Sequence, residues 1–148
     1  MNKLFFVLLL SLASISEARL AGNWTGWGTW KFKGEGDGAN CNPMQMQWSE
    51  SKNAIAIERG IFDCGIVVMH LDKTPWTLKD GLLFDEEQKE VGSYDGTNFE
   101  VFMPSPNEKT TIHIKVKRTA NHYDYSEIWF NQYEKVYVIE GRLFTSGE

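Results

Sequence analysis

Alternation of apolar and polar residues is the feature that most constrains the fold of this chain. Apolar side chains recur at every second position in several short stretches, among them 44–48, 112–116 and 123–129. A repeat of two residues is the pattern of a β-strand with one buried face. No stretch shows a convincing helical repeat. We therefore expect an all-β protein.

Turn signals separate the alternating stretches. Asp80-Gly81 and Asp95-Gly96 are residue pairs favoured in tight hairpins, and the charged stretch 86–90 fits the end of another hairpin. The short connections favour pairing between strands that follow one another. A meander of this size avoids exposed edges by closing on itself, so we predict an antiparallel up-and-down barrel of roughly 8–10 strands.

Three segments have a pattern of their own. Gly26 and Gly28 fall within the first predicted strand, 24–33, which indicates a bend or the close approach of another element. Residues 34–42 are polar and rich in glycine, and we expect a loop there. Residues 66–71 are more continuously apolar, so we expect that strand to be buried on both faces.

The first 18 residues have the layout of a secretory signal peptide. A positive residue, Lys3, precedes the apolar run 4–12, and Ser16-Glu17-Ala18 fits the small-x-small cleavage rule. The run is shorter than the roughly 20 residues that span a bilayer, and a buried N-terminal helix is the alternative. Cleavage after Ala18 would leave residues 19–148 as a single β-barrel domain, exported to the periplasm or secreted.

The charge pattern argues against two classes of partner. The chain has 148 residues and a net charge of −5, whereas nucleic-acid binders usually carry a basic patch. Its one dense basic run, 115–118, alternates as the solvated side of a strand would. No second long apolar run follows residue 12. We therefore predict neither nucleic-acid binding nor an integral membrane domain.

The chain has two cysteines, Cys41 and Cys64. In an oxidising compartment an isolated pair is most simply a disulfide, which would stabilise the fold by about 3 kcal/mol in the chain-entropy model. A reactive or metal-binding thiol is the alternative. The spacing matches no zinc pattern, and we predict no metal site.

Ionisable residues within strands are the candidates for chemistry. His70 and Asp72 share a strand face, as do His122 and Asp124, and two such pairs meeting across a barrel could bind a metal or exchange protons. Pairs lying separately at the surface are the alternative. No Gly-x-Ser-x-Gly elbow is present.

Three glutamates, Glu58, Glu127 and Glu140, fall within otherwise apolar strands. A carboxylate turned inward there would have a raised pKa and would suit catalysis or ligand pairing. Outward alternation is the alternative for each of them.

The segment 20–24, Leu-Ala-Gly-Asn-Trp, resembles the Gly-x-Trp opening of the lipocalins and their calycin relatives. In that family a basic residue of the last strand covers the tryptophan, and Arg142 stands where this partner of Trp24 would be. The resemblance implies a closed antiparallel barrel with a cavity for a small apolar molecule.

The stretch Gly28-Thr29-Trp30-Lys31, followed by Gly-Glu-Gly at 34–36, is similar to the first strand of nitrobindin-like haem barrels. Those proteins bind iron through a histidine in the C-terminal part of the chain. Here the last histidine is His122 and the final strand has none, so we predict no cofactor.

The leading hypothesis is therefore an exported protein that binds a small hydrophobic or amphipathic ligand inside a β-barrel. We expect an apolar wall with few polar groups, formed by Trp24, Trp30, Met44, Met46, Trp48, His70, Tyr125 and Trp129. One alternative is a barrel enzyme, an isomerase or hydrolase, that uses an inward histidine or glutamate. The other is a surface-interaction protein, such as a carbohydrate binder that stacks sugars on Trp27 and Trp76.

Overall fold

The computed structural model describes residues 19–33, 35–132 and 134–146, and the predicted signal peptide, 1–18, lies outside the described residues. The described residues form strands and turns, and within them no helix is long and apolar enough to cross a membrane. The strands are β1 (Gly22–Phe32), β2 (Ala39–Ser51), β3 (Ala54–Asp63), β4 (Val68–Leu71), β5 (Thr74–Lys79), β6 (Leu82–Phe84), β7 (Glu90–Tyr94), β8 (Asn98–Pro104), β9 (Thr111–Arg118), β10 (His122–Asn131) and β11 (Glu134–Thr145).

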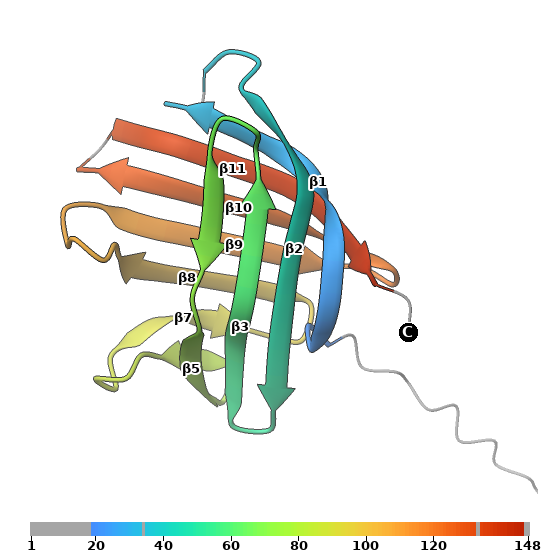
Figure 1. The fold of residues 1–148 in the computed structure, drawn as a ribbon. Helices are drawn as coiled ribbons and strands as arrows, with labels where there is room; N and C mark the ends of the chain where they lie inside the picture. Colours follow the sequence, from blue (N-terminus) through green and yellow to red (C-terminus); the bar gives the residue numbers. More distant parts are fainter. Residues whose placement is uncertain (1–18, 34, 133, 147–148) are drawn as a thin grey trace, which may run out of the picture.

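The strands form a closed antiparallel barrel (Figure 1). From β5 to β11 each strand pairs with its neighbour in the chain, β1 pairs with both β11 and β2, and the pairing of β2 with β3 closes the ring. Ten strands make up the barrel. The short β4 pairs with the end of β3, beyond the part of β3 that pairs with β5. The predicted all-β meander and its closure into a barrel are confirmed.

Aromatic side chains fill the half of the barrel nearest the start of β1. The ring of Trp24 packs against Tyr123 at a centroid distance of 4.7 Å. Phe99 lies edge-on to both Trp48 and Trp76, each with its ring centroid 5.2 Å away. These side chains are buried, so this half of the barrel is a packed core.

Two facing glycines make room for a methionine in that core. Gly28 of β1 is paired with Gly141 of β11. A Cβ atom on Gly28 would lie 2.6 Å from the Met44 sulfur, and one on Gly141 would lie 2.5 Å from it. Real side chains do not approach this closely, so the missing Cβ atoms let Met44 lie fully buried. The predicted close approach at Gly28 is confirmed.

The N-terminal segment closes this end of the barrel. Leu20 is fully buried, its backbone N–H donates to the Glu50 carboxylate at 3.0 Å, and the Trp24 indole N–H donates to its carbonyl at 2.7 Å. The Tyr94 hydroxyl donates to the same carboxylate at 3.0 Å. Burial, and then the charge of Glu50, raise the pKa of Tyr94 well above its usual range.

The cation that covers Trp24 differs from the predicted one. The Arg118 guanidinium lies 4.5 Å from the Trp24 ring centroid. Arg142 instead forms an ion pair with Asp124, with 2.7 Å between Nε and Oδ1. The β10–β11 register places Asp124 opposite Arg142, at a position that alternates with the buried Tyr123 and Tyr125, and so on the outer face. The predicted bracing of Trp24 by Arg142 is therefore wrong.

The predicted disulfide between Cys41 and Cys64 is confirmed. It joins the start of β2 to the turn that follows β3, and the two Cα atoms are 3.8 Å apart. The predicted loop 34–42 is too long, because β2 begins at Ala39 and its residue Asn40 pairs with Thr29 of β1.

The prediction that residues 66–71 are buried on both faces is wrong. Ile66 is 80% exposed, and Val67 and Val68 are also exposed. The backbone N–H of Cys64 donates to the carbonyl of Val67, which closes a tight turn between β3 and β4. Strand β4 pairs with β3 alone, so this segment lies at the rim of the barrel, where little packs over its outer face.

Candidate functional site

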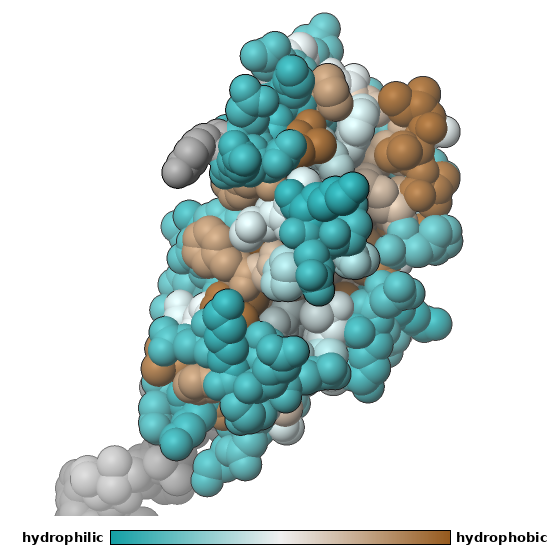
Figure 2. Space-filling view, turned by 90° about the vertical axis from the view of Figure 1, so that its left-hand side faces the viewer, coloured by the Kyte–Doolittle hydropathy of each residue, from teal (hydrophilic) through white to brown (hydrophobic). Residues whose placement is uncertain are grey.

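The opposite end of the barrel holds a pocket of about 320 Å³. Small-molecule sites have volumes of about 300–1,000 Å³. Figure 2 faces the side with the β8–β9 and β10–β11 turns, where brown and white surface is exposed between teal hydrophilic side chains. The lining residues are Ile57, Phe62, Met69, His70, Leu71, Asp72, Thr74, Trp76, Met103, Pro106, Ile112, Ile114, Glu127, Trp129, Tyr137 and Ile139.

A buried carboxylate, Glu127, lies in this apolar pocket. Alternation along β10 turns Tyr125, Glu127 and Trp129 toward the same, inner face of the barrel. Glu127 is 7% exposed. Its two oxygens accept hydrogen bonds from the Tyr125 hydroxyl and the Trp129 indole N–H. Tyr125 and Trp129 therefore hold the carboxylate in place from two residues before and two residues after it.

The electrostatics of the pocket follow from this burial. Burial raises the pKa of Glu127, and the hydrogen bonds from Tyr125 and Trp129 oppose that shift. Burial also raises the pKa of Tyr137, and the nearby charge of Glu127 raises it further. Among the described residues no ion pair reaches Glu127. The ionised form is thus stabilised by neutral donors only.

Apart from this carboxylate, the inner walls are apolar and aromatic. Ile112, Ile114 and Ile139 are buried around it. The rings of Trp129 and Tyr137 lie 4.8 Å apart between centroids. Polar side chains occur at the rim. The arrangement suits a molecule with an apolar body and one polar group.

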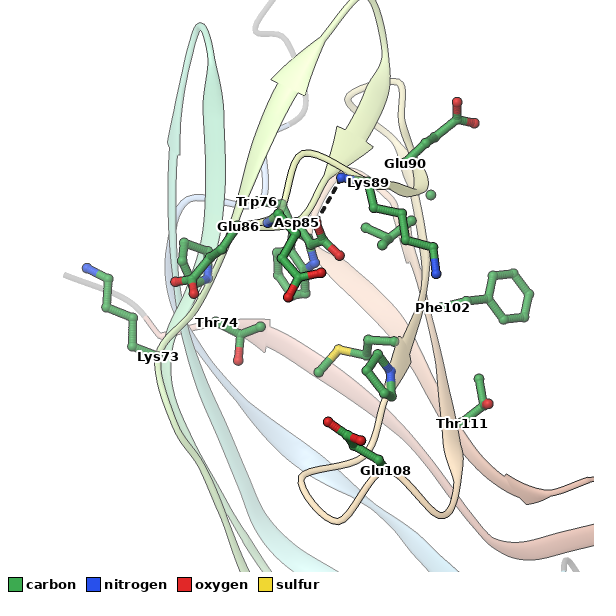
Figure 3. A pocket seen from close by; sticks show the side chains of 16 residues that line it. Lys73, Thr74, Trp76, Asp85, Glu86, Lys89, Glu90, Phe102, Glu108 and Thr111 are labelled. Carbon is green, nitrogen blue, oxygen red and sulfur yellow. Dashed lines mark hydrogen bonds between the residues drawn. The ribbon is translucent and has the colours of Figure 1, made fainter.

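An acidic groove of about 970 Å³ adjoins the pocket. The two hollows share Thr74, Trp76 and Met103 among their lining residues. The groove is lined by five carboxylates and two lysines, namely Asp85, Glu86, Glu87, Glu90, Glu108, Lys73 and Lys89. In Figure 3 the side chains of Glu86 and Glu108 extend into it from different loops, whereas Glu90 points away.

The acidic residues of the groove are not arranged as a metal site. The Asp85 carboxylate accepts a hydrogen bond from the backbone N–H of Lys89 at 2.9 Å, drawn dashed in Figure 3, and so belongs to the turn between β6 and β7. No three or more His, Cys, Asp or Glu side chains within the described residues are grouped so that they could hold a metal ion.

The residues predicted to form the ligand wall are divided between the pocket and the packed core. His70 and Trp129 line the pocket, and Tyr125 lies behind Glu127. Trp30 is half-buried beside Tyr137, at a centroid distance of 6.1 Å. The remaining four predicted residues do not line this pocket and are buried in the core, namely Trp24, Met44, Met46 and Trp48.

The two predicted His–Asp pairs do not meet. His70 and Asp72 both line the pocket rim. His122 lies toward the other end of β10, where its ring nitrogen contacts the Thr119 hydroxyl at 3.0 Å. The partner predicted for it, Asp124, binds Arg142.

Trp27 and Trp76 do not form a common surface for stacking sugars. Trp27 is 57% exposed and packs on Phe144 at a centroid distance of 5.3 Å. Trp76 is buried in the core.

Of the three glutamates singled out in the sequence, Glu127 alone points inward. Glu58 forms an ion pair with Lys73 at 2.8 Å, and Glu140 is exposed. The signal that distinguishes Glu127 is its spacing of two residues from Tyr125 and from Trp129, because residues two apart on a strand share a face and both were assigned to the inner face. Tyr137 carries no such signal in the sequence.

Comparison with known proteins identifies no family for this chain. No protein-family model matches it, and no curated protein has a sequence that matches it.

Proposed function

We propose that this protein is an exported binding protein that holds one small amphipathic molecule at the open end of its barrel. One observation carries the proposal: the apolar pocket contains the buried carboxylate of Glu127. Burying an ionisable group is costly unless something compensates for it. The packed core shows that this chain can fill the same kind of space with apolar side chains, so a carboxylate at this place points to a ligand.

Apolar burial supplies most of the affinity in this proposal. A ligand that buries about 200 Å² of apolar surface gains roughly 5 kcal/mol. Association costs reduce that gain. Glu127 then contributes specificity more than affinity, because it selects the polar group that the ligand presents to it.

The resemblance to the lipocalins and their calycin relatives is part of the proposal. It is supported by the closed antiparallel barrel and by a cation over Trp24 near the start of β1. Two features depart from that family. The barrel has ten strands where lipocalins have about eight, and the cation is Arg118, at the end of β9 rather than on the last strand.

Export is supported by the disulfide as well as by the N-terminal sequence. Disulfides persist in oxidising compartments and are rare in the cytosol. Cys41 and Cys64 are bonded to each other, and no other cysteine is present.

A fluorescence titration with a neutral apolar probe, N-phenyl-1-naphthylamine, tests the binding function. Met103 lines the pocket and is half-buried, so the variant Met103→Trp should block it. The matched control is Leu82→Trp on β6, away from the pocket. We expect saturable binding to the wild type and to L82W, and weak binding to M103W. Equal binding to all three, or none to the wild type, would contradict the proposal.

A second candidate is a barrel enzyme in which Glu127 transfers a proton. It is favoured by the raised pKa of this carboxyl, a property shared by many catalytic acids in apolar sites. The two functions differ in the fate of the bound molecule. A binding protein releases its ligand with an unchanged mass, whereas an isomerase or hydrolase releases a product with a different structure or mass.

A further inference from the structure

We infer that the ligand carries a protonated amine, which pairs with the Glu127 carboxylate while its apolar body lies against the aromatic walls of the pocket. This inference rests on the proposed function, because it specifies the chemistry of a ligand held in the same pocket.

The first argument is the uncompensated charge of Glu127. Its oxygens accept one hydrogen bond each, from Tyr125 and from Trp129. A carboxylate oxygen has about two acceptor positions, so each oxygen retains room for another donor. An ammonium group is a compact cation with up to three donors. It would supply both the missing hydrogen bonds and the missing positive charge.

The second argument is the aromatic character of the walls. Trp129 and Tyr137 lie close together and both line the pocket. The faces of aromatic rings attract cations within about 6 Å, and indole does so most strongly. The same rings also pack well against the apolar body of a ligand.

The third argument is the charge of the approach. The groove beside the pocket has five carboxylates and two lysines. The carboxylates outnumber the lysines, and a groove with an excess of one sign of charge raises the local concentration of ligands with the opposite sign. It attracts cations and repels anions. The carboxylate of a fatty acid would be repelled in the groove and again by the Glu127 carboxylate in the pocket.

Together these features rank the ligand classes. An anion meets the excess of carboxylates in the groove and then the Glu127 carboxylate, and a neutral apolar molecule gains nothing from Glu127. A bare metal ion would lack ligands, since the described residues hold no group of three or more metal-ligating side chains. A monoamine with an aromatic or aliphatic body uses every feature of the pocket.

Three probes that share a phenyl ring on a short chain and differ in their polar group test the inference: 2-phenylethylamine, 2-phenylethanol and phenylacetate. Each competes with N-phenyl-1-naphthylamine at neutral pH, and the concentration that displaces half of the bound probe is measured. We expect the amine to bind at least about tenfold more tightly than the alcohol, and phenylacetate to bind most weakly. In Glu127→Gln the preference for the amine should disappear, while the naphthylamine probe still binds.

The matched control is Glu140→Gln, which removes an exposed carboxylate that lines neither the pocket nor the groove and should keep the preference. Equal displacement by amine and alcohol, with the naphthylamine probe bound, overturns the inference and leaves the proposed function intact. A preference that survives in E127Q also overturns it. Failure of the wild type to bind the naphthylamine probe contradicts the proposed function itself.

Discussion

The variant Leu20→Ala tests whether the N-terminal segment closes the barrel. The Leu20 side chain is 0% exposed, and its backbone forms hydrogen bonds with Glu50 and Trp24. Truncation to alanine keeps both backbone hydrogen bonds. The change in stability therefore reports only the packing of the leucine side chain.

The expected loss of unfolding free energy is about 3 kcal/mol. Fully burying a leucine contributes roughly 1.5–3 kcal/mol, and Leu→Ala changes in cores cost about 2–5 kcal/mol because a cavity remains. A value in the lower half of the range of about 2–5 kcal/mol is expected, since Leu20 lies before β1 and the backbone there can relax into the space. For a domain of about 130 residues this lowers Tm by roughly 10 °C.

Urea unfolding followed by tryptophan fluorescence measures this effect. The matched control is Leu82→Ala, because Leu82 is 37% exposed and its truncation should cost less than about 1 kcal/mol. If L20A and L82A lose equal free energy, the N-terminal segment does not close the barrel.

Three further predictions concern the disulfide, the arginines and Glu127. Reduction of Cys41–Cys64, whose residues are 23 apart, should lower the unfolding free energy by about 3.4 kcal/mol in urea titrations, and an unchanged midpoint would contradict this. Arg118→Ala should lower the unfolding free energy by about 0.5–1 kcal/mol, because it removes the cation–π contact with Trp24. Arg142→Ala should leave the urea midpoint unchanged, because its ion pair is exposed to solvent. Equal losses in the two variants would refute the assignment of Arg118 as the cation that covers Trp24. Because the folded-state pKa of Glu127 is raised above its ordinary value of 4.5, its contribution to stability is present below pH 4.5 and is lost as pH rises through the folded-state pKa. As pH rises through that range, the unfolding free energy of Glu127→Gln should fall less steeply than that of the wild type. Parallel curves of unfolding free energy against pH would show that Glu127 makes no such contribution.

The features that the sequence predicts best are those set by neighbouring residues. Alternation alone identified most of the strands, and the Asp-Gly pairs at 80–81 and 95–96 lie in the turns after β5 and β7. The disulfide followed from there being only two cysteines. Each of these predictions depends on local backbone geometry or on composition, so it needs no knowledge of which strands pair.

Errors arose where long-range pairing decides the outcome. The exposure of Val68, the first residue of β4, depends on β4 pairing with β3 alone, which an apolar run cannot reveal. The choice of Arg118 over Arg142 depends on the register that sets Arg142 opposite Asp124. Both residues are basic and occur in strands, so composition does not distinguish them.

The candidate site was predicted in part. Parity along β10 places Glu127 on the inner face, and the sequence singled out that residue together with two others that point outward. Alternation could not show which half of the barrel is hollow. That depends on the summed volumes of side chains from all the strands, including the room that two glycines leave for Met44.

Methyl NMR with 13C-labelled methionine tests the central claim most directly. Met69 and Met103 line the pocket, whereas Met44 and Met46 are buried in the packed core. Addition of N-phenyl-1-naphthylamine should shift the methyl signals of Met69 and Met103 and leave those of Met44 and Met46 in place. Shifts confined to the core methionines, or no shift at saturating probe, would contradict a ligand pocket at the open end of the barrel.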